Sequence, residues 1–225
     1  MRSSFVCIVT ASGARRGIAL LTLGAVVAAA AATDVAVSLN PALATTRAYP
    51  WGDSNHGWEF TVNYMIEVTH IGMLDLTTGG GIAPDGFLLA HDVGLFRMDG
   101  ALLTAGTLSP GTGDMLLDNF RYVPVSPVML SPGEHYAVVY YAATNEWPTV
   151  DETIAAIPSF QASPAINYVA ARSSWGDGSL ALPSNQIDPN NPHPYCFGTN
   201  FLFVPEPGTL FLLGLAGAAL LRRRA

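Results

Sequence analysis

Glycine and proline interrupt the central part of this 225-residue chain so often that long helices have little room. Residues 45–203 contain 16 glycines and 13 prolines, and the longest stretches free of both are 14 residues, Trp58–Ile71 and Glu134–Trp147. Both stretches are rich in β-branched and aromatic residues, which favour strands. Every second residue of Trp58–Tyr64 is aromatic or aliphatic. This period of two is typical of a strand with one buried face.

Turn residues divide the same region into further strands. Asp99-Gly100 and Ser131-Pro132-Gly133 each join two apolar runs, a pattern that predicts β-hairpins. After the strand that begins at Trp58, we expect strands at Ile66–Leu74, His91–Met98, Ala101–Leu108, Val123–Leu130, Glu134–Ala142, Ile166–Ala170 and Phe201–Val204. One helix is expected at Thr149–Ile157, with Asp151 as its cap. Short strands with frequent turns predict an all-β fold, an antiparallel β-sandwich of the jelly-roll or immunoglobulin-like kind.

The charge of this region argues against one class of partner. Residues 45–203 carry four arginines and 15 carboxylates, a net charge of −11, and the chain contains no lysine. Such a domain cannot neutralise a phosphate backbone, so we expect no nucleic-acid binding. Its only cysteine is Cys196, because the other, Cys7, lies near the N-terminus. A multi-cysteine metal site is excluded, whereas a buried thiol and an intermolecular disulfide both stay open for Cys196.

Residues 1–44 have the layout of a secretory signal peptide. Three arginines accompany an apolar run, Gly17–Ala32, and small residues suited to signal peptidase follow at Ala30–Ala32 and again at Ala42–Ala44. We expect cleavage after Ala44, because a polar stretch begins there, and export by the Sec machinery. The site at Ala30–Ala32, twin-arginine export and a retained N-terminal anchor are the alternatives.

The last 22 residues, 204–225, have three parts in a fixed order. Pro205, Glu206 and Pro207 precede Leu210–Leu221, a run without a charge, and the chain then reaches Arg222, Arg223 and Arg224. The run is short for a full membrane span, but it shows no polar face of the kind that a core helix has. Arginines after such a run favour the cytoplasmic side of a membrane. We therefore expect a membrane-spanning helix with an arginine anchor.

This layout closely resembles the PEP-CTERM sorting signal of exported proteins in Gram-negative bacteria that make extracellular polysaccharide. The resemblance implies that an exosortase, a membrane enzyme with a cysteine nucleophile, recognises Pro205, Glu206 and Pro207 and cuts near them. It also implies a transient inner-membrane anchor followed by transfer to the cell surface or extracellular matrix, with exopolysaccharide as a candidate partner. An ordinary tail anchor is the alternative.

The central region, residues 45–203, is expected to form one domain. From about residue 55 it is similar to an uncharacterised all-β domain family of exported bacterial proteins. The similarity rests on the segments Gly57–Val62, Val68-Thr69, His91–Phe96, Asp99-Gly100, Phe120–Val123 and Asn200-Phe201. It implies a fold and a compartment but no reaction.

Residue patterns typical of catalysis are missing from the sequence. The five histidines lack metal-ligand spacings such as HxH or HExxH, and there is no Gly-x-Ser-x-Gly nucleophile elbow. We therefore expect that the protein is not an enzyme, although the carboxylate pair of a secreted hydrolase stays open. Asp75, Asp85 and Asp92 bracket a glycine-rich loop and are candidate calcium ligands, with solvated turns as the alternative.

Three tryptophans lie beside turn residues rather than inside strand patterns: Trp51, Trp147 and Trp175. Loop aromatics stack on sugar rings, so these residues are candidate ligand-binding positions; packing in small satellite clusters is the alternative. Trp58 is assigned to the core. We expect a non-catalytic structural or adhesive component of an exopolysaccharide matrix. A carbohydrate-binding module is the second hypothesis and a secreted hydrolase the third.

Overall fold

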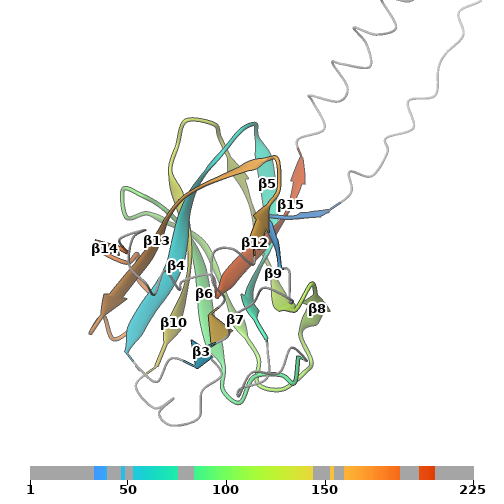
Figure 1. Ribbon diagram of the computed structural model, residues 1–225, viewed down its shortest axis with the longest axis vertical. Coiled ribbons are helices and arrows are strands. Elements are labelled where there is room, and N and C mark those ends of the chain that lie inside the picture. Colours follow the sequence, from blue (N-terminus) through green and yellow to red (C-terminus); the bar gives the residue numbers. More distant parts are fainter. Residues whose placement is uncertain are drawn as a thin grey trace, which may run out of the picture. The chain divides into compact units, whose positions relative to one another are not determined.

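The computed structural model describes residues 33–39, 47–48, 53–75, 84–143, 153–154, 160–187 and 198–205 (Figure 1). A five-stranded antiparallel sheet has the order β1 (Asp34–Val35), β15 (Thr199–Pro205), β5 (Ile66–Leu74), β9 (Phe120–Leu130) and β8 (Met115–Leu117). A six-stranded antiparallel sheet has the order β14 (Asn185–Gln186), β13 (Ile166–Trp175), β4 (Ser54–Val62), β10 (Tyr136–Ala142), β6 (His91–Arg97) and β7 (Leu102–Leu108). Two short pairs join β11 (Thr153–Ile154) to β3 (Arg47–Ala48) and β12 (Phe160–Ala162) to β2 (Val37–Leu39).

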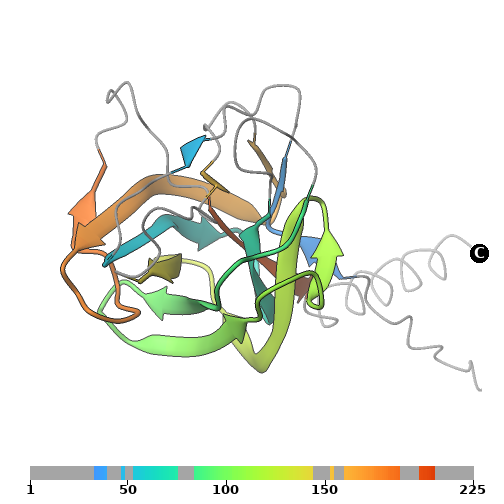
Figure 2. The same cartoon turned by 90° about the horizontal axis from the view of Figure 1, so that it is seen from below.

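The two large sheets face each other (Figure 2), and aromatic side chains pack between them. Trp58 and Phe60 of β4 contact Phe201 of β15, with ring centroids 6.0 and 4.9 Å apart, and all three side chains are fully buried. The indole Nε1–H of Trp58 also donates a hydrogen bond of 2.8 Å to the carbonyl oxygen of Thr199. This bond satisfies the one polar group of the indole inside the core. The predicted all-β antiparallel fold is confirmed, and the two packed sheets are consistent with a β-sandwich.

The outer face of the six-stranded sheet is covered as well. Phe96, Ala137 and Val139 form a second buried cluster, against which Leu180 and Leu182 pack from the segment after β13. Strand β4 is central in this sheet, and all but one of its residues are buried. The sequence pattern predicted one buried face for this strand. On the second face, Asn55 bonds the segment after β13, and Arg172 and His135 cover Glu59.

The turn residues in the sequence predicted the positions of most strands correctly. Both predicted turns are present, and their glycines, Gly100 and Gly133, have φ angles of 98° and 87°, which side chains disfavour. Asp99-Gly100 closes the predicted hairpin of β6 and β7. The second predicted hairpin is wrong, because Ser131-Pro132-Gly133 joins β9 of the five-stranded sheet to β10 of the six-stranded sheet, and each strand pairs with other partners. The predicted helix at Thr149–Ile157 is wrong where it is described, because Thr153–Ile154 forms β11 and pairs with Arg47–Ala48. Both residues of β11 are β-branched, and β-branched side chains fit a pleated strand better than a helix.

The domain begins earlier than the predicted boundary at residue 45. Strand β1 pairs with β15, Asp34 opposite Phe203, and β2 pairs with β12. Ala36, Val37 and Leu39 are buried in the main core. The boundary at residue 45 is therefore wrong, because residues 34–39 belong to the sheets. Ala44 itself lies outside the described residues, but cleavage there would remove β1 and β2 from the fold.

Two predicted segments lie outside the described residues: the apolar run of the signal peptide, Gly17–Ala32, and the membrane-spanning run Leu210–Leu221. Within the part of the chain that the structure describes, no helix is long and apolar enough to cross a membrane.

Candidate functional site

The C-terminal tripeptide begins inside a core strand. Strand β15 pairs with β5 from Thr199 opposite Met73 to Pro205 opposite Ile66. Phe203, two residues before the end of β15, is fully buried. Proline lacks a backbone donor and cannot continue the hydrogen-bond ladder of an interior strand, and β15 ends at Pro205. Glu206, Pro207 and the arginines at 222–224 lie outside the described residues. The folded domain therefore extends to the first residue of the tripeptide, with no linker before it.

Trp175 lies at the end of β13, and 54% of its surface is exposed. In the register it stands opposite Ser54, and its ring meets the ring of His56 edge-on with centroids 6.1 Å apart. His56 is buried, and its Nε2 lies 2.9 Å from Ser54 Oγ. Burial lowers the pKa of His56 to about 4, so this ring is neutral near neutral pH. Trp175 is thus an exposed indole on a rigid, uncharged support.

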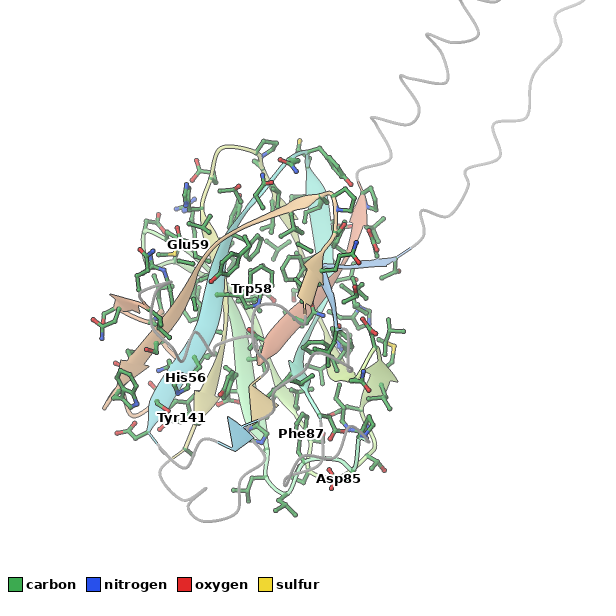
Figure 3. All side chains as sticks on the ribbon, viewed as in Figure 1. His56, Trp58, Glu59, Asp85, Phe87 and Tyr141 are labelled. Carbon is green, nitrogen blue, oxygen red and sulfur yellow. The ribbon has the colours of Figure 1, made fainter. Side chains whose placement is uncertain are left out.

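Polar groups fix the turn after Trp175 against the start of β4. Asp53 Oδ1 accepts a hydrogen bond of 2.7 Å from the backbone N–H of Gly178 and one of 3.2 Å from Tyr141 Oη. Asn55 Nδ2 donates to Asp177 Oδ2 at 2.8 Å. His56 and Tyr141 are labelled at the same end of the six-stranded sheet in Figure 3. The pleat places Trp175 on the face of Ser54 and His56, whereas Asn55 and Tyr141 lie on the other face. The exposed ring of Trp175 by itself is suited to stacking on a sugar. Of the three candidate tryptophans, Trp51 and Trp147 lie outside the described residues.

Asp75 is held in a buried ion pair with Arg121. Its Oδ2 lies 2.5 Å from Arg121 Nε, and the two side chains are 2% and 4% exposed. Asp75 Oδ1 also accepts hydrogen bonds from the backbone N–H groups of Asp85 at 3.2 Å and Gly86 at 3.1 Å. Arg121 Nη1 donates to the carbonyl oxygen of Thr112 at 2.9 Å. The oxygens of Asp75 are therefore used by protein groups that fasten two loops to the sheet.

The other two calcium candidates do not join Asp75 in a cluster. Asp85 and Asp92 are exposed, and Asp92 Oδ1 accepts a hydrogen bond of 2.7 Å from Thr107 Oγ1. Among the described residues, no group of three or more His, Cys, Asp and Glu side chains is arranged to hold a metal ion. The glycine-rich loop between these aspartates, residues 76–83, lies outside the described residues.

A charged group that the sequence pattern did not reveal lies on the outer face of the six-stranded sheet. Glu59 of β4 is 7% exposed in its side chain and is labelled in Figure 3. Arg172 Nη2 donates to Glu59 Oε2 at 2.5 Å, and His135 Nδ1 lies 2.6 Å from Glu59 Oε1. Burial alone would raise the pKa of Glu59, but the hydrogen bonds from His135 and Arg172 lower it below its usual value. Glu59 is therefore a buried carboxylate with a partner on each oxygen.

This group borders an open hollow of about 680 Å³. The hollow is lined by Glu59, Arg97, Met98, Asp99, Gly133, Glu134, His135 and Arg172. Arg97 pairs with Asp99 at 2.5 Å, so both arginines of the hollow already have a carboxylate partner. Positive and negative groups nearly balance, which suits a neutral polar ligand better than a highly charged one.

The sequence holds a local signal for only one member of the group. Glu59 follows Trp58 and precedes Phe60, so the alternation places it on the outer face. His135 and Arg172 are 76 and 113 residues away in the chain. Only the pairing of β4 with β10 and β13 brings them to Glu59.

The comparison with known families bears on the C-terminus. Residues 203–225 match the family described as the PEP-CTERM protein-sorting motif. No curated protein matches the chain. The chain therefore carries a PEP-CTERM sorting motif, as its tripartite layout predicted. This motif indicates an exported protein that has a C-terminal membrane anchor and is processed by an exosortase.

Proposed function

We propose that the protein is a non-catalytic structural or adhesive component of an extracellular matrix that contains exopolysaccharide. The observation that carries this proposal is the sorting motif at residues 203–225, which continues directly from core strand β15. The folded part of the chain is then the domain that the motif directs to the cell surface. In this proposal the domain is a β-sandwich of the jelly-roll or immunoglobulin-like kind.

Maturation removes both ends of the chain in this proposal. The Sec machinery exports the protein, and signal peptidase cuts at Ala30–Ala32, which leaves β1 and β2 in place. Exosortase cuts after Pro205 and releases the domain from the inner membrane. A cut before β15 would instead remove Phe201 and Phe203, which are fully buried in the core.

Intact mass measurement of the secreted protein tests this maturation. We expect a species that starts within residues 31–33, retains Phe203 and lacks Leu210–Ala225 in cells with an exosortase. In cells without that enzyme, the C-terminus should stay on the protein and the protein should stay with the membrane. A secreted protein with an intact C-terminus would overturn the proposal. Loss of matrix cohesion in a gene deletion tests the structural role separately.

The hydrogen bonds of the buried carboxylate of Glu59 support a non-catalytic role. A general base needs an oxygen that is free to accept a proton. Both oxygens of Glu59 are bonded to His135 and Arg172, and their hydrogen bonds lower its pKa. Glu59 is therefore better suited to holding the sheet face than to proton transfer.

Carbohydrate binding is a second candidate, favoured by the exposed ring of Trp175 at the end of β13. Retention on a column of the cell's own exopolysaccharide tests it. We expect Trp175→Ala to lose retention and Leu102→Ala, which alters a side chain of similar exposure on β7, to keep it. Equal retention of the two variants, or no retention of the parent protein on any glycan column, would exclude this candidate.

A further inference from the structure

The chain leaves the folded domain toward its membrane anchor at one end of the five-stranded sheet. Pro205 lies opposite Ile66, and Ile66 lies opposite Leu130, so the end of β15, the start of β5 and the end of β9 meet there (Figure 1). The apolar run Leu210–Leu221 starts five residues after Pro205. Five residues span at most about 18 Å even when fully extended. This end of the domain is therefore tethered close to the surface of the bilayer.

Large apolar side chains are exposed at the same end. Tyr64 and Met65, in the turn between β4 and β5, are each 37% exposed, and Met129 near the end of β9 is 43% exposed. Met65 immediately precedes Ile66, and Met129 immediately precedes Leu130, the partner of Ile66. Met65 and Met129 therefore lie on one face of the sheet as diagonal neighbours. The two methionines are flexible and the tyrosine has an apolar ring with a polar tip, a combination that suits the boundary between lipid and water.

We propose that Tyr64, Met65 and Met129 form an apolar tip that rests in the surface of the lipid bilayer while the C-terminal segment anchors the protein. This inference rests on the anchor in the proposed function. Three partly exposed side chains are a small contact, too small to hold a free protein on a membrane. A short tether gives the tip a high effective concentration at the bilayer, so a weak contact is enough.

The charges of the domain limit this contact to the anchored state. Glu67 lies opposite both Met129 and Val204, and the domain as a whole is acidic. Negative charge opposes binding to an anionic lipid surface. Once exosortase cuts after Pro205, the tip alone does not retain the domain. The contact orients the junction at Pro205 toward the membrane before the cut and does not delay release after it.

Lipid quenching of a site-specific label tests the proposal with the full chain in proteoliposomes of zwitterionic phospholipid. Cys7 and Cys196 are replaced by serine, and single cysteines at position 65, 129 or 88 carry an environment-sensitive fluorophore. Leu88 is the matched control, because it is 62% exposed but directly follows Phe87, which Figure 3 labels. Gly86 of the same segment bonds Asp75, which follows the far end of β5. We expect phospholipids with brominated chains to quench the label at positions 65 and 129 at least twofold more than at position 88.

Three results would overturn the proposal: equal quenching at 65 and 88, no quenching at 65, or a blue shift at 65 that grows with protein density but not with brominated lipid. The last result would indicate contact between copies of the chain. Carbonate extraction of the same proteoliposomes separates this proposal from the proposed function. A chain that resists extraction but shows no quenching at position 65 is anchored without a lipid-bound tip. A chain that is extracted has lost the anchor itself.

Discussion

Asp75 Oδ2 and Arg121 Nε lie 2.5 Å apart at a place where both side chains are almost completely buried. Asp75 directly follows β5, and Arg121 lies near the start of β9, opposite Met73 of β5. Their other hydrogen bonds reach Asp85 and Gly86, after β5, and Thr112 and Asp114, just before β8. One ion pair thus connects the neighbouring strands β5 and β9 with the loop that follows β5 and the loop that precedes β8.

Replacing Arg121 by methionine should destabilise the domain by about 3–5 kcal/mol, because it leaves the carboxylate of Asp75 buried without a cation. Urea unfolding at neutral pH measures this loss. Arg97→Met is the matched control, since Arg97 pairs with Asp99 in solvent, where both side chains are about half exposed. We expect the control to leave the unfolding midpoint unchanged. Similar losses in both variants would contradict a special role for the buried pair.

Stability should decrease as the pH falls from about 6.5 toward 4, because the unfolded state binds a proton at His56 that the folded state does not. The folded-state pKa of about 4 against 6.5 corresponds to about 3 kcal/mol over that window. Urea unfolding at several pH values measures the slope, and His56→Gln should remove most of it. An unchanged slope in the variant would show that another group causes the acid sensitivity.

Glu59 should affect the stability of the domain at lower pH than His56 does. Its pKa is lowered in the folded state, so its ion pairs stabilise the domain above about pH 4.5, and this stability is lost as the pH falls through the lower folded-state value. Glu59→Gln should therefore be less stable than the parent at neutral pH but lose less stability as the pH falls through that window. Unfolding curves of both proteins test this, and parallel losses with pH would contradict it.

Gly57→Ala should disrupt the pairing of β4 with β10. A Cβ atom at this position would lie 2.1 Å from the carbonyl oxygen of Val138, a backbone atom that cannot move aside without breaking the ladder. We expect a loss of at least about 3 kcal/mol, the upper part of the range for overpacking. Thermal unfolding measures it, with Gly113→Ala as the control, because a Cβ there meets nothing within 4 Å. A Gly57→Ala melting curve like that of the control would contradict the expectation.

The sequence predicted the parts of the fold that depend on local chemistry. The alternation that begins at Trp58 and the turn glycines Gly100 and Gly133 act within a few residues, so strands β4 to β7, β9 and β10 were expected close to their observed places. The tripartite layout of the last 22 residues is equally local. It predicted the sorting motif, which the match at residues 203–225 confirms.

The features that the sequence did not predict depend on contacts between distant residues. Residues 34–39 follow an apolar, alanine-rich run and read as part of the leader, but Asp34 and Val35 pair with a strand at the other end of the chain. Thr153–Ile154 is too short to show a period, and its partner is Arg47–Ala48. Glu59 gains its role only when β10 and β13 bring His135 and Arg172 beside it. Such relations require the sheet order, which no local pattern contains.

The position of β15 has a consequence for the order of events during export. It is the last strand in the described part of the chain, yet it lies in the interior of its sheet, between β1 and β5. A chain that crosses the membrane with its N-terminus first brings β1 and β5 out long before β15, and they have no direct pairing that would close the gap. The aromatic core lacks Phe201 and Phe203 until then. The domain therefore reaches its native state only when translocation is nearly finished, and the same few residues complete the fold and present the signal for release.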